Sequence, residues 1–345
     1  MSLDSQPLRG VIAGLGVMGS HHLRVLGSMP YAEVVGVADP DPDRLAAAAR
    51  AHPGVATHVT LEDALDAHTP DFVCLAVPVR SLPAAAHTAL TAGAHVLVEK
   101  PTAATEDEAA ELLQAVDSRG LVAGVGHVER FNPAVVALKD KLDRGLIGRV
   151  VQMHARRLSP YPNRNSTLGV AFDLATHDVD VMRYLSGSEV ARVSAETARP
   201  LGSVGEDLIC ATLRFDSDAM GVLESNWVTP TKVRQLSVTG EHGMLTVDYL
   251  TQDLCLYEHP TKPTEWDALA GMRGGGEGDM IRFALQRREP LRVQWERFLD
   301  AVYSRTEPPV GIRDGIAALS TARSIQVAGD KHGTVVPNYR AISAL

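Results

Sequence analysis

The stretch that decides the fold of the first half of the chain reads Arg9-Gly10-Val11-Ile12-Ala13-Gly14-Leu15-Gly16-Val17-Met18-Gly19, and a helical pattern follows it. The order is an apolar strand, a glycine turn and a helix. Gly14 permits a tight turn, Gly16 lets the backbone approach a pyrophosphate, and Gly19 lets the helix pack against the strand. Because the free N–H groups of a helix start face such an anion, the stretch predicts a dinucleotide-binding unit.

A second apolar strand, at residues 33–38, ends in Asp39, which follows Gly19 by 20 residues. This interval matches the one of about 20 residues between a glycine turn and the acid that binds the adenosine ribose. We interpret Asp39 as the acceptor of both ribose hydroxyls. A carboxylate there would repel a 2′-phosphate, so NAD is favoured over NADP as the cofactor. The alternative is that Asp39 only caps a helix at residues 43–51.

Three further apolar runs, at residues 72–77, 96–99 and 121–125, alternate with helical patterns. Strands without polar alternation that are separated by helices predict a parallel sheet with both faces covered, as in a doubly wound Rossmann fold. Ligands of such sheets bind beyond the carboxyl ends of the strands. The residues that we expect at this rim to bind the cofactor are Gly14, Gly16, Val17, Met18, Gly19, Asp39, Ala76, Val77, Pro78, Glu99 and Lys100.

The texture of the sequence changes after Gly126, where strand-like stretches follow one another with few helices between them. Residues 212–215 and 235–238 alternate polar and apolar side chains, as half-exposed antiparallel strands do. We therefore predict a Rossmann domain at 1–126 and a substrate-binding and oligomerisation domain of the α+β class at 127–345, built on a large, mostly antiparallel open sheet. If the exposed face of this sheet is apolar, a homodimer or homotetramer would cover it.

One helical pattern, at residues 173–185, interrupts these strands. Asp173, His177 and Asp180 have the spacing i, i+4 and i+7, so they share one face of a regular helix. Carboxylates beside an imidazole raise its pKa and fix its tautomer, which suits a general base near neutral pH. A solvated helix face is the alternative. No metal site is expected, because one histidine and two acids have no further ligand cluster beside them.

Composition limits the remaining classes of function. The chain has 345 residues and a formal net charge of −9 at pH 7, without a dense run of Lys or Arg. A nucleic acid or an anionic membrane would need a basic face, so neither is an expected partner. No apolar run reaches the roughly 18 residues of a membrane span. Cys74, Cys210 and Cys255 are isolated, which predicts buried, reduced thiols in a cytoplasmic protein.

Three motifs resemble the glucose–fructose oxidoreductase and inositol dehydrogenase (Gfo/Idh/MocA) family of sugar and polyol dehydrogenases. They are the glycine turn at 14–19, the triplet Glu99-Lys100-Pro101, and the helix with Asp173 and His177. The resemblance implies that Lys100 and His177 meet across the nicotinamide. It also implies that His177 accepts a proton, while Asp173 and Lys100 position the reacting hydroxyl. For the Lys100–Pro101 bond we expect the cis isomer.

Within this family, the stretches 126–133, 156–162 and 239–244 are similar to UDP-N-acetylglucosamine 3-dehydrogenases. An acidic protein that binds a diphosphate needs guanidinium groups at the site. The candidates near the start of the second domain are Arg130, Arg156, Arg157 and Arg164, with plain surface arginines as the alternative. The residues that we expect to bind the substrate are Asn132, Arg156, Asp173 and His177.

The sequence thus predicts an NAD-dependent dehydrogenase that oxidises a secondary hydroxyl of a pyranose, at C3 of UDP-N-acetylglucosamine, by hydride transfer to the nicotinamide. One alternative is a dehydrogenase of a free polyol or monosaccharide, such as inositol. Another is a regulator that binds NAD without turnover, because a fold by itself does not prove activity. The presence of Lys100, Asp173 and His177 argues against the regulator.

Overall fold

The chain divides into two compact units. Its structure is a computed structural model that describes residues 6–162, 168–259 and 278–339. The first unit contains the described residues up to Val128 together with 289–320, and the second contains most of the rest. The division lies close to the predicted boundary at 126. However, residues 289–320, which were expected in the second domain, pack with the first.

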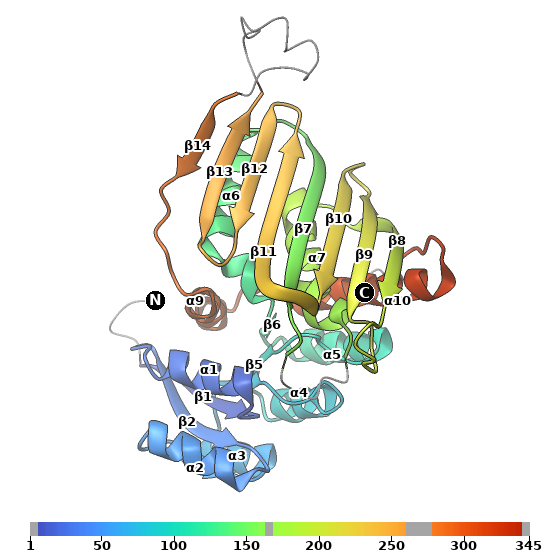
Figure 1. Cartoon of the computed structure of the whole chain (residues 1–345). Helices are drawn as coiled ribbons and strands as arrows, with labels where there is room; N and C mark the ends of the chain where they lie inside the picture. The colour runs from blue at the N-terminus through green and yellow to red at the C-terminus, as the bar shows by residue number, and fades with distance from the viewer. Residues whose placement is uncertain (1–5, 163–167, 260–277, 340–345) are drawn as a thin grey trace, which may run out of the picture. The chain divides into compact units, whose positions relative to one another are not determined.

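The elements of the first unit are β1 (Leu8–Ala13), α1 (Val17–Leu26), β2 (Ala32–Ala38), α2 (Pro42–Ala51), β3 (Ala56–His58), α3 (Leu61–His68), β4 (Phe72–Leu75), α4 (Leu82–Thr91), β5 (His95–Val98), α5 (Glu106–Arg119), β6 (Ala123–Val125) and α9 (Pro290–Ser304). All six strands are parallel, in the order β3-β2-β1-β4-β5-β6. Figure 1 labels β1, β2, β5 and β6 of this sheet. Helix α1 packs beside α9, and α4 packs between α3 and α5. The strand order reverses between β1 and β4, which confirms the doubly wound Rossmann sheet.

Helix α9 belongs to the first unit because its aromatic side chains fill the core of that unit. Trp295 and Phe298 are buried, and their rings lie 5.5 and 6.4 Å from the ring of Phe72 on β4. Ile12 of β1 lies in the same apolar cluster. Burial of large aromatic side chains is a strong source of packing energy, so it outweighs the position of α9 late in the sequence.

The elements of the second unit are η1 (Val128–Phe131), α6 (Pro133–Asp143), β7 (Val150–Pro160), η2 (Ala171–Ala175), α7 (Thr176–Ser186), β8 (Val190–Ala198), β9 (Leu208–Phe215), β10 (Met220–Asn226), β11 (Val228–Gly240), β12 (Gly243–Asp248), β13 (Asp253–Glu258), β14 (Met280–Phe283) and α10 (Ile312–Lys331), which begins in the first unit. The sheet has the order β14-β13-β12-β11-β7-β10-β9-β8. Among the described strands of this second sheet only β7 and β10 pair in parallel, so its predicted antiparallel character is confirmed.

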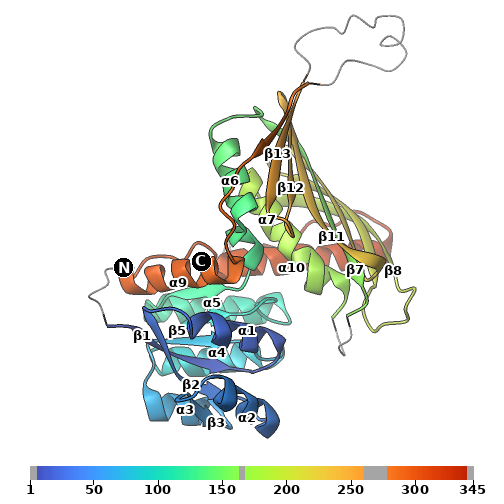
Figure 2. The same cartoon turned by 60° about the vertical axis from the view of Figure 1, so that its left-hand side comes forward.

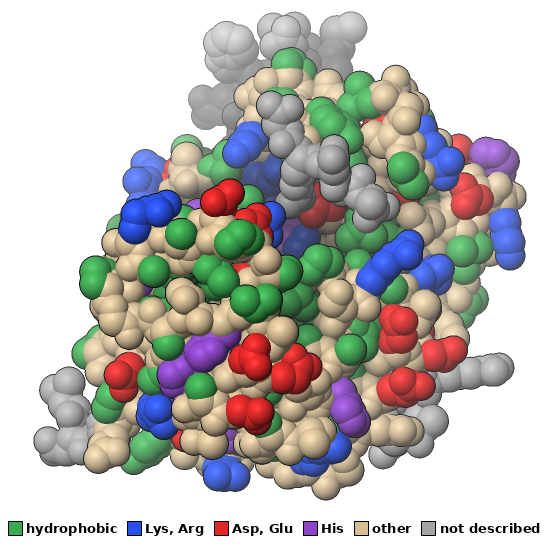
Figure 3. All heavy atoms as spheres, turned by 90° about the horizontal axis from the view of Figure 1, so that it is seen from below, with side chains coloured by type: hydrophobic (Ala, Val, Ile, Leu, Met, Phe, Trp, Pro, Cys, Tyr) green, Lys and Arg blue, Asp and Glu red, His purple; other side chains and the backbone are tan. Residues whose placement is uncertain are grey.

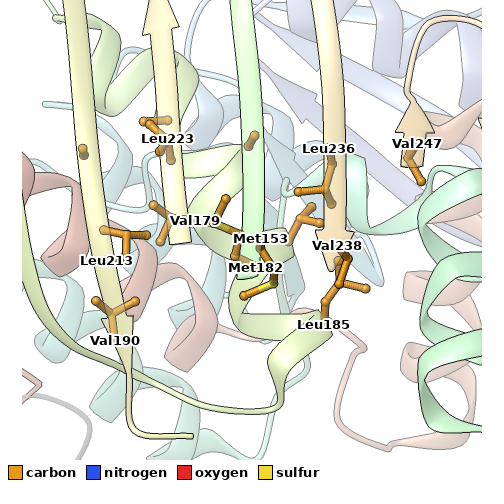
Figure 4. Close-up of a cluster of buried hydrophobic side chains, with 14 of the residues drawn as sticks. Met153, Val179, Met182, Leu185, Val190, Leu213, Leu223, Leu236, Val238 and Val247 are labelled. Atoms are coloured by element: carbon orange, nitrogen blue, oxygen red, sulfur yellow. The ribbon is translucent and has the colours of Figure 1, made fainter. Parts of the chain in front are cut away.

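One face of this large sheet carries the core of the second unit. Figure 2 shows α6 and α7 on that face, and no helix of the described chain covers the other. Met153, Leu223 and Leu236 point inward from three strands and pack against Val179 and Met182 of α7 (Figure 4). We call the helix-covered side the inner face and the opposite side the outer face. Strand alternation then decides which face each polar side chain joins.

The cysteines differ from the prediction of three buried thiols. All three are free, but only Cys74 is buried, whereas Cys255 is half-buried and Cys210 is exposed. Cys210 alternates with the buried Ile209 and Ala211 along β9, and so it lies on the outer face. The apolar character of that strand belongs to its inward residues only.

The side of the molecule in Figure 3 shows Lys and Arg side chains interspersed with Asp and Glu, without a continuous basic surface. None of the described helices has the combined length and apolar character needed to span a membrane. Groups of three or more His, Cys, Asp or Glu that could hold a metal ion do not occur in the described ranges.

Candidate active site

The glycine turn between β1 and α1 combines two tight positions with an open one. Gly14 has a φ of +86°, and a Cβ there would lie 2.5 Å from the carbonyl oxygen of Ala76. A Cβ on Gly19 would overlap the carbonyl oxygen of Gly14. At Gly16, by contrast, a Cβ would have no atom of the described chain within 4 Å. The turn therefore fits a ligand that approaches the backbone at Gly16, as a pyrophosphate does.

Asp39 connects the end of β2 to the glycine turn. Its Oδ2 accepts the backbone N–H of Leu15 at 2.6 Å, and its Oδ1 accepts that of Asp41 at 2.9 Å. Asp41 caps α2 by accepting the backbone N–H of Asp43, so the alternative that Asp39 is the helix cap is wrong. The Arg44 guanidinium lies 3.5 Å from Asp39 Oδ2, a neighbour that the motif does not indicate. The carboxylate thus lies at the turn, where a ribose-binding acid is expected.

The remaining residues of the expected cofactor rim follow two neighbouring strands, β4 and β5, or begin helix α1. Ala76, Val77 and Pro78 follow β4, which pairs with both β1 and β5. Glu99 and Lys100 follow β5 and are half-buried. The first residues of α1 complete the rim, with Val17 exposed and Met18 packed against the core.

Glu99 is held by a buried histidine, which is itself held by a buried tryptophan. His22 of α1 is fully buried, and its Nε2 lies 2.9 Å from Glu99 Oε1. Trp295 of α9 donates its indole N–H to His22 Nδ1 at 2.9 Å. The third neighbour is Gly126, where a Cβ would lie 2.7 Å from Glu99 Oε1. Nothing in the sequence links Trp295 to His22, since 273 positions separate them.

The proton of His22 can be assigned from these contacts. Burial lowers the pKa of His22, whereas its neighbours Cys74 and Glu99 act in the opposite direction. An indole N–H can only donate, so a protonated Nδ1 would set two donors against each other. We therefore assign the neutral ring with its proton on Nε2, donated to Glu99. The carboxylate of Glu99 is thus held in one orientation beside Lys100.

The Lys100–Pro101 peptide bond is cis, as expected from the sequence.

In the second unit, Asp173 and His177 are the accessible residues of an otherwise buried segment. Within 170–183 they are the two half-buried positions, and every other residue of that range is buried. Asp173 lies in the π-helical turn η2, and His177 is the second residue of α7. A π-turn changes the angle between successive residues, so the regular-helix spacing predicted for Asp173 and His177 does not hold.

Asp180 is the part of the helix prediction that the structure corrects. It is fully buried, and both its oxygens accept hydrogen bonds from Arg130, at 2.7 Å from Nε and 2.6 Å from Nη2. A bidentate pair of this kind fixes both side chains. Asp180 therefore supports the fold as the partner of Arg130, and Arg130 is not available for a diphosphate.

Arg157 is likewise bound in a buried ion pair. It donates from Nε and Nη2 to Asp178 at 2.7 and 2.8 Å, and from Nη1 to Glu129 at 2.9 Å. Burial alone would lower the pKa of Arg157, but Asp178 and Glu129 raise it well above its ordinary value. Burial raises the pKa of Asp178 against the opposing effect of Arg157. The two-pronged geometry requires a carboxylate, so we assign both groups as charged.

Two of the expected substrate-binding residues have other roles. Asn132 is buried and caps α6: its Oδ1 accepts the backbone N–H of Ala134, and its Nδ2 donates to the Tyr249 carbonyl. Arg156 lies on the outer face of β7, where it pairs with Glu224 at 3.0 Å. Strand alternation therefore separates Arg156 from the face that α7 covers. The fourth arginine of the prediction, at position 164, lies outside the described residues.

Sequence reasoning missed Arg234. It lies on β11 opposite Arg157 of β7, and it shares the inner face with the buried Leu236 and Val238. The alternation from Arg234 to Val238 was the signal that could have found it. Arg234 is half-buried and close enough to Asp173 for that carboxylate to act on its pKa.

The first unit has a parallel sheet with a glycine turn that leaves space at Gly16, and the second unit has half-buried Asp173 and His177. Together these features are typical of a dinucleotide-dependent oxidoreductase. Comparison with known families agrees. Residues 8–127 match the model of the oxidoreductase family with an NAD-binding Rossmann fold, and residues 135–246 match the GFO/IDH/MocA C-terminal domain. The chain belongs to the Gfo/Idh/MocA family of oxidoreductases.

Individual relatives cover most of the chain. The chain is 28% identical over 324 residues to a UDP-N-acetylglucosamine 3-dehydrogenase of Acidithiobacillus ferrooxidans, with 91% of this chain and 96% of the relative covered. It is 30% identical over 321 residues to inositol 2-dehydrogenase 1 of Saccharopolyspora erythraea, with 91% of each covered.

Solved structures share the fold. That of the Acidithiobacillus ferrooxidans UDP-N-acetylglucosamine 3-dehydrogenase superposes with a TM-score of 0.83 at 24% identity, covering 95% of this chain and 99% of that one. A levoglucosan dehydrogenase in complex with NADH and L-sorbose gives a TM-score of 0.84 at 21% identity, covering 97% and 100%.

Proposed function

We propose that this protein is an NAD-dependent dehydrogenase that oxidises a secondary hydroxyl of a pyranose, at C3 of UDP-N-acetylglucosamine. The observation that carries the proposal is the open space at Gly16 within an otherwise tight turn, on the same strand rim as Lys100. The similarity to a UDP-N-acetylglucosamine 3-dehydrogenase over most of both chains supports the choice of substrate.

The first unit supplies cofactor binding in this proposal. The backbone at Gly16 and the start of α1 bind the pyrophosphate, and Asp39 accepts the ribose hydroxyls. Bound NAD would supply the acceptor for the hydride that leaves the substrate carbon. Asp39 favours NAD over NADP, because its buried carboxylate would repel a 2′-phosphate. The guanidinium of Arg44 lies near this carboxylate and would offset only part of the repulsion. Asp39→Ala should narrow the ratio of kcat/KM for NAD over NADP.

The second unit supplies the proton acceptor. We assign to His177 the removal of the hydroxyl proton, and to Lys100 a hydrogen bond to the same oxygen that limits its negative charge. Asp173 orients the hydroxyl. The partial exposure of Asp173 and His177 in an otherwise buried segment supports these roles.

The test is the turnover of variants with UDP-N-acetylglucosamine and NAD. His177→Ala and Lys100→Ala should each lower kcat by at least about a hundredfold, the scale of general acid–base catalysis. His154, on the outer face of β7, offers a matched control, and His154→Ala should leave kcat unchanged. A loss below about tenfold in both catalytic variants, or about 1.4 kcal/mol, would refute the assignment.

A free polyol or monosaccharide is the second candidate substrate, favoured by the 30% identity to an inositol 2-dehydrogenase. Reduction of NAD should be followed at fixed enzyme against UDP-N-acetylglucosamine, myo-inositol and free hexoses. Turnover of inositol that UDP does not inhibit would select this candidate. Absence of turnover across the panel, with NAD bound, would favour the non-catalytic regulator.

We also propose a homodimer or homotetramer through the outer face of the second sheet, in a cytoplasmic protein. Met220, Tyr257 and Met280 support it, because they are 42%, 41% and 59% exposed on strands of that sheet. Light scattering after gel filtration should give two or four times the chain mass of 36.9 kDa. Tyr257→Glu should lower that mass, and a monomeric wild type would contradict the proposal.

A further inference from the structure

Arg234 lies in the second unit at a point where two strands bring arginines together. In the register of β7 and β11, Arg234 is directly opposite Arg157. Both side chains belong to the inner face, which α7 covers, but Arg157 is buried whereas Arg234 is half-buried. Two guanidinium groups on adjacent strands repel each other unless anions lie between or beside them.

The two arginines are satisfied in different ways. Arg157 has Asp178 and Glu129 as carboxylate partners. Arg234 uses only Nη1, which donates to the carbonyl oxygens of Leu158 at 2.5 Å and Val233 at 2.9 Å. No carboxylate of the described chain lies within ion-pair distance of Arg234. Its Nε and Nη2 have no acceptor among the described residues.

The unused groups of Arg234 have a specific shape. The Nε–H and Nη2–H of a guanidinium form the fork that binds two oxygens of a carboxylate or phosphate side by side. The backbone bonds at Nη1 hold the opposite edge, so the fork is oriented before any ligand arrives. Such a preoriented fork recognises an oxyanion by both its charge and the spacing of two of its oxygens.

The charges that face Arg234 come from four elements, namely β7, η1, η2 and α7. Burial and Arg157 lower the pKa of Arg234, while Asp178, Glu129 and Asp173 act in the opposite direction. Asp178 and Glu129 are already bound to Arg157. Asp173 belongs to the segment to which the proposed function assigns the reacting hydroxyl, which puts Arg234 beside the substrate.

We propose that Arg234 binds an oxyanion of the substrate, so that the enzyme acts on sugars carrying a phosphate or carboxylate group rather than on neutral polyols. This inference rests on the proposed function for the location of the sugar. The diphosphate of a nucleotide-sugar and the carboxylate of a sugar acid share this chemistry, and the two differ in where the charge is carried.

The experiment compares Arg234→Gln, Arg234→Lys and wild-type full-length protein. UDP, UDP-N-acetylglucosamine, glucuronate and myo-inositol are titrated by calorimetry in the presence of NAD. Arg234→Gln should weaken binding of the anionic probe at least tenfold, and Arg234→Lys should recover part of the loss, since it keeps the charge but not the fork. Preferential loss for UDP identifies a diphosphate, and preferential loss for glucuronate a carboxylate.

Arg214→Gln is the matched control. Arg214 is a half-buried arginine on the outer face of β9 whose Nη1 also donates to a carbonyl, that of Asp218 at 2.7 Å. The Arg214→Gln variant should bind every probe with the affinity of the wild type. Equal NAD affinity and melting temperature in the Arg234 variants show that the fold is intact.

The outcomes separate this inference from the proposed function. The inference is overturned if no anionic probe binds the wild type, if Arg234→Gln binds the anions within twofold of wild type, or if it loses myo-inositol to the same degree. UDP or glucuronate binding that depends on Arg234, without turnover of any sugar, supports the anion site and rejects the dehydrogenase. Turnover of myo-inositol that is the same in Arg234→Gln and wild type supports the dehydrogenase and rejects the anion site.

Discussion

The two units of this chain build their candidate sites from different materials. In the first unit the glycine turn is shaped by backbone: Gly14 and Gly19 have no room for a Cβ, whereas Gly16 has open space. In the second unit the inner face of the sheet is shaped by charged side chains, of which Arg157 is neutralised and Arg234 is not. Backbone constraints leave a residue signature in the sequence. Ion pairing depends on which side chains meet in space, and so it leaves no such signature.

The largest effect is expected in the second unit, where a buried charge can be stranded. Asp178→Ala leaves the guanidinium of Arg157 buried with only Glu129, and it should lower the free energy of unfolding by about 3–5 kcal/mol. Urea unfolding followed by circular dichroism measures it. Glu224→Ala breaks the exposed pair with Arg156 and should cost under about 1 kcal/mol. Equal costs would show that burial does not set the difference.

The next effect tests the tight part of the glycine turn. Gly19→Ala places a methyl group against the carbonyl oxygen of Gly14, and the overlap should destabilise the first unit by about 3 kcal/mol. Differential scanning calorimetry reports the shift. Gly311→Ala, at a glycine of the same unit with no atom of the described chain within 4 Å of a Cβ, should leave the melting temperature unchanged.

The open part of the turn should respond in binding rather than in stability. Gly16→Ala meets no atom of the described chain, so the melting temperature should stay the same. The added methyl occupies the space assigned to the pyrophosphate, and the Kd for NAD should rise at least about tenfold, or 1.4 kcal/mol. Calorimetric titration with NAD measures it. Unchanged NAD affinity would remove the main support for the proposed cofactor site.

The smallest effect concerns a buried side-chain hydrogen bond of the first unit, the one from Trp295 to His22. Trp295→Phe removes the indole N–H that His22 Nδ1 accepts and should cost about 1 kcal/mol beyond the lost packing. Trp227→Phe in the second unit is the control, because the Trp227 indole N–H donates to no described group. The two unfolding free energies are compared. If Trp227→Phe costs as much as Trp295→Phe, the bond to His22 adds nothing measurable.

Much of the first unit could be predicted from the sequence. The apolar strands, the glycine turn and Asp39 give the parallel sheet and its binding rim, because each depends on neighbours in sequence. The α+β character of the second unit followed from polar–apolar alternation in the same way. The return of α9 to the first unit could not be predicted, since it depends on Trp295 meeting Phe72 more than 200 positions away.

The candidate site shows where prediction from sequence ended. The sequence by itself determined the glycine turn, the acid after β2, and the presence of Lys100, Asp173 and His177, because these are local motifs. Only the tertiary structure decided that Arg157 is neutralised while Arg234 keeps a free fork on the same inner face. The physical reason is that a charged side chain is paired or unpaired according to its neighbours in space, and strand register and helix packing set those neighbours.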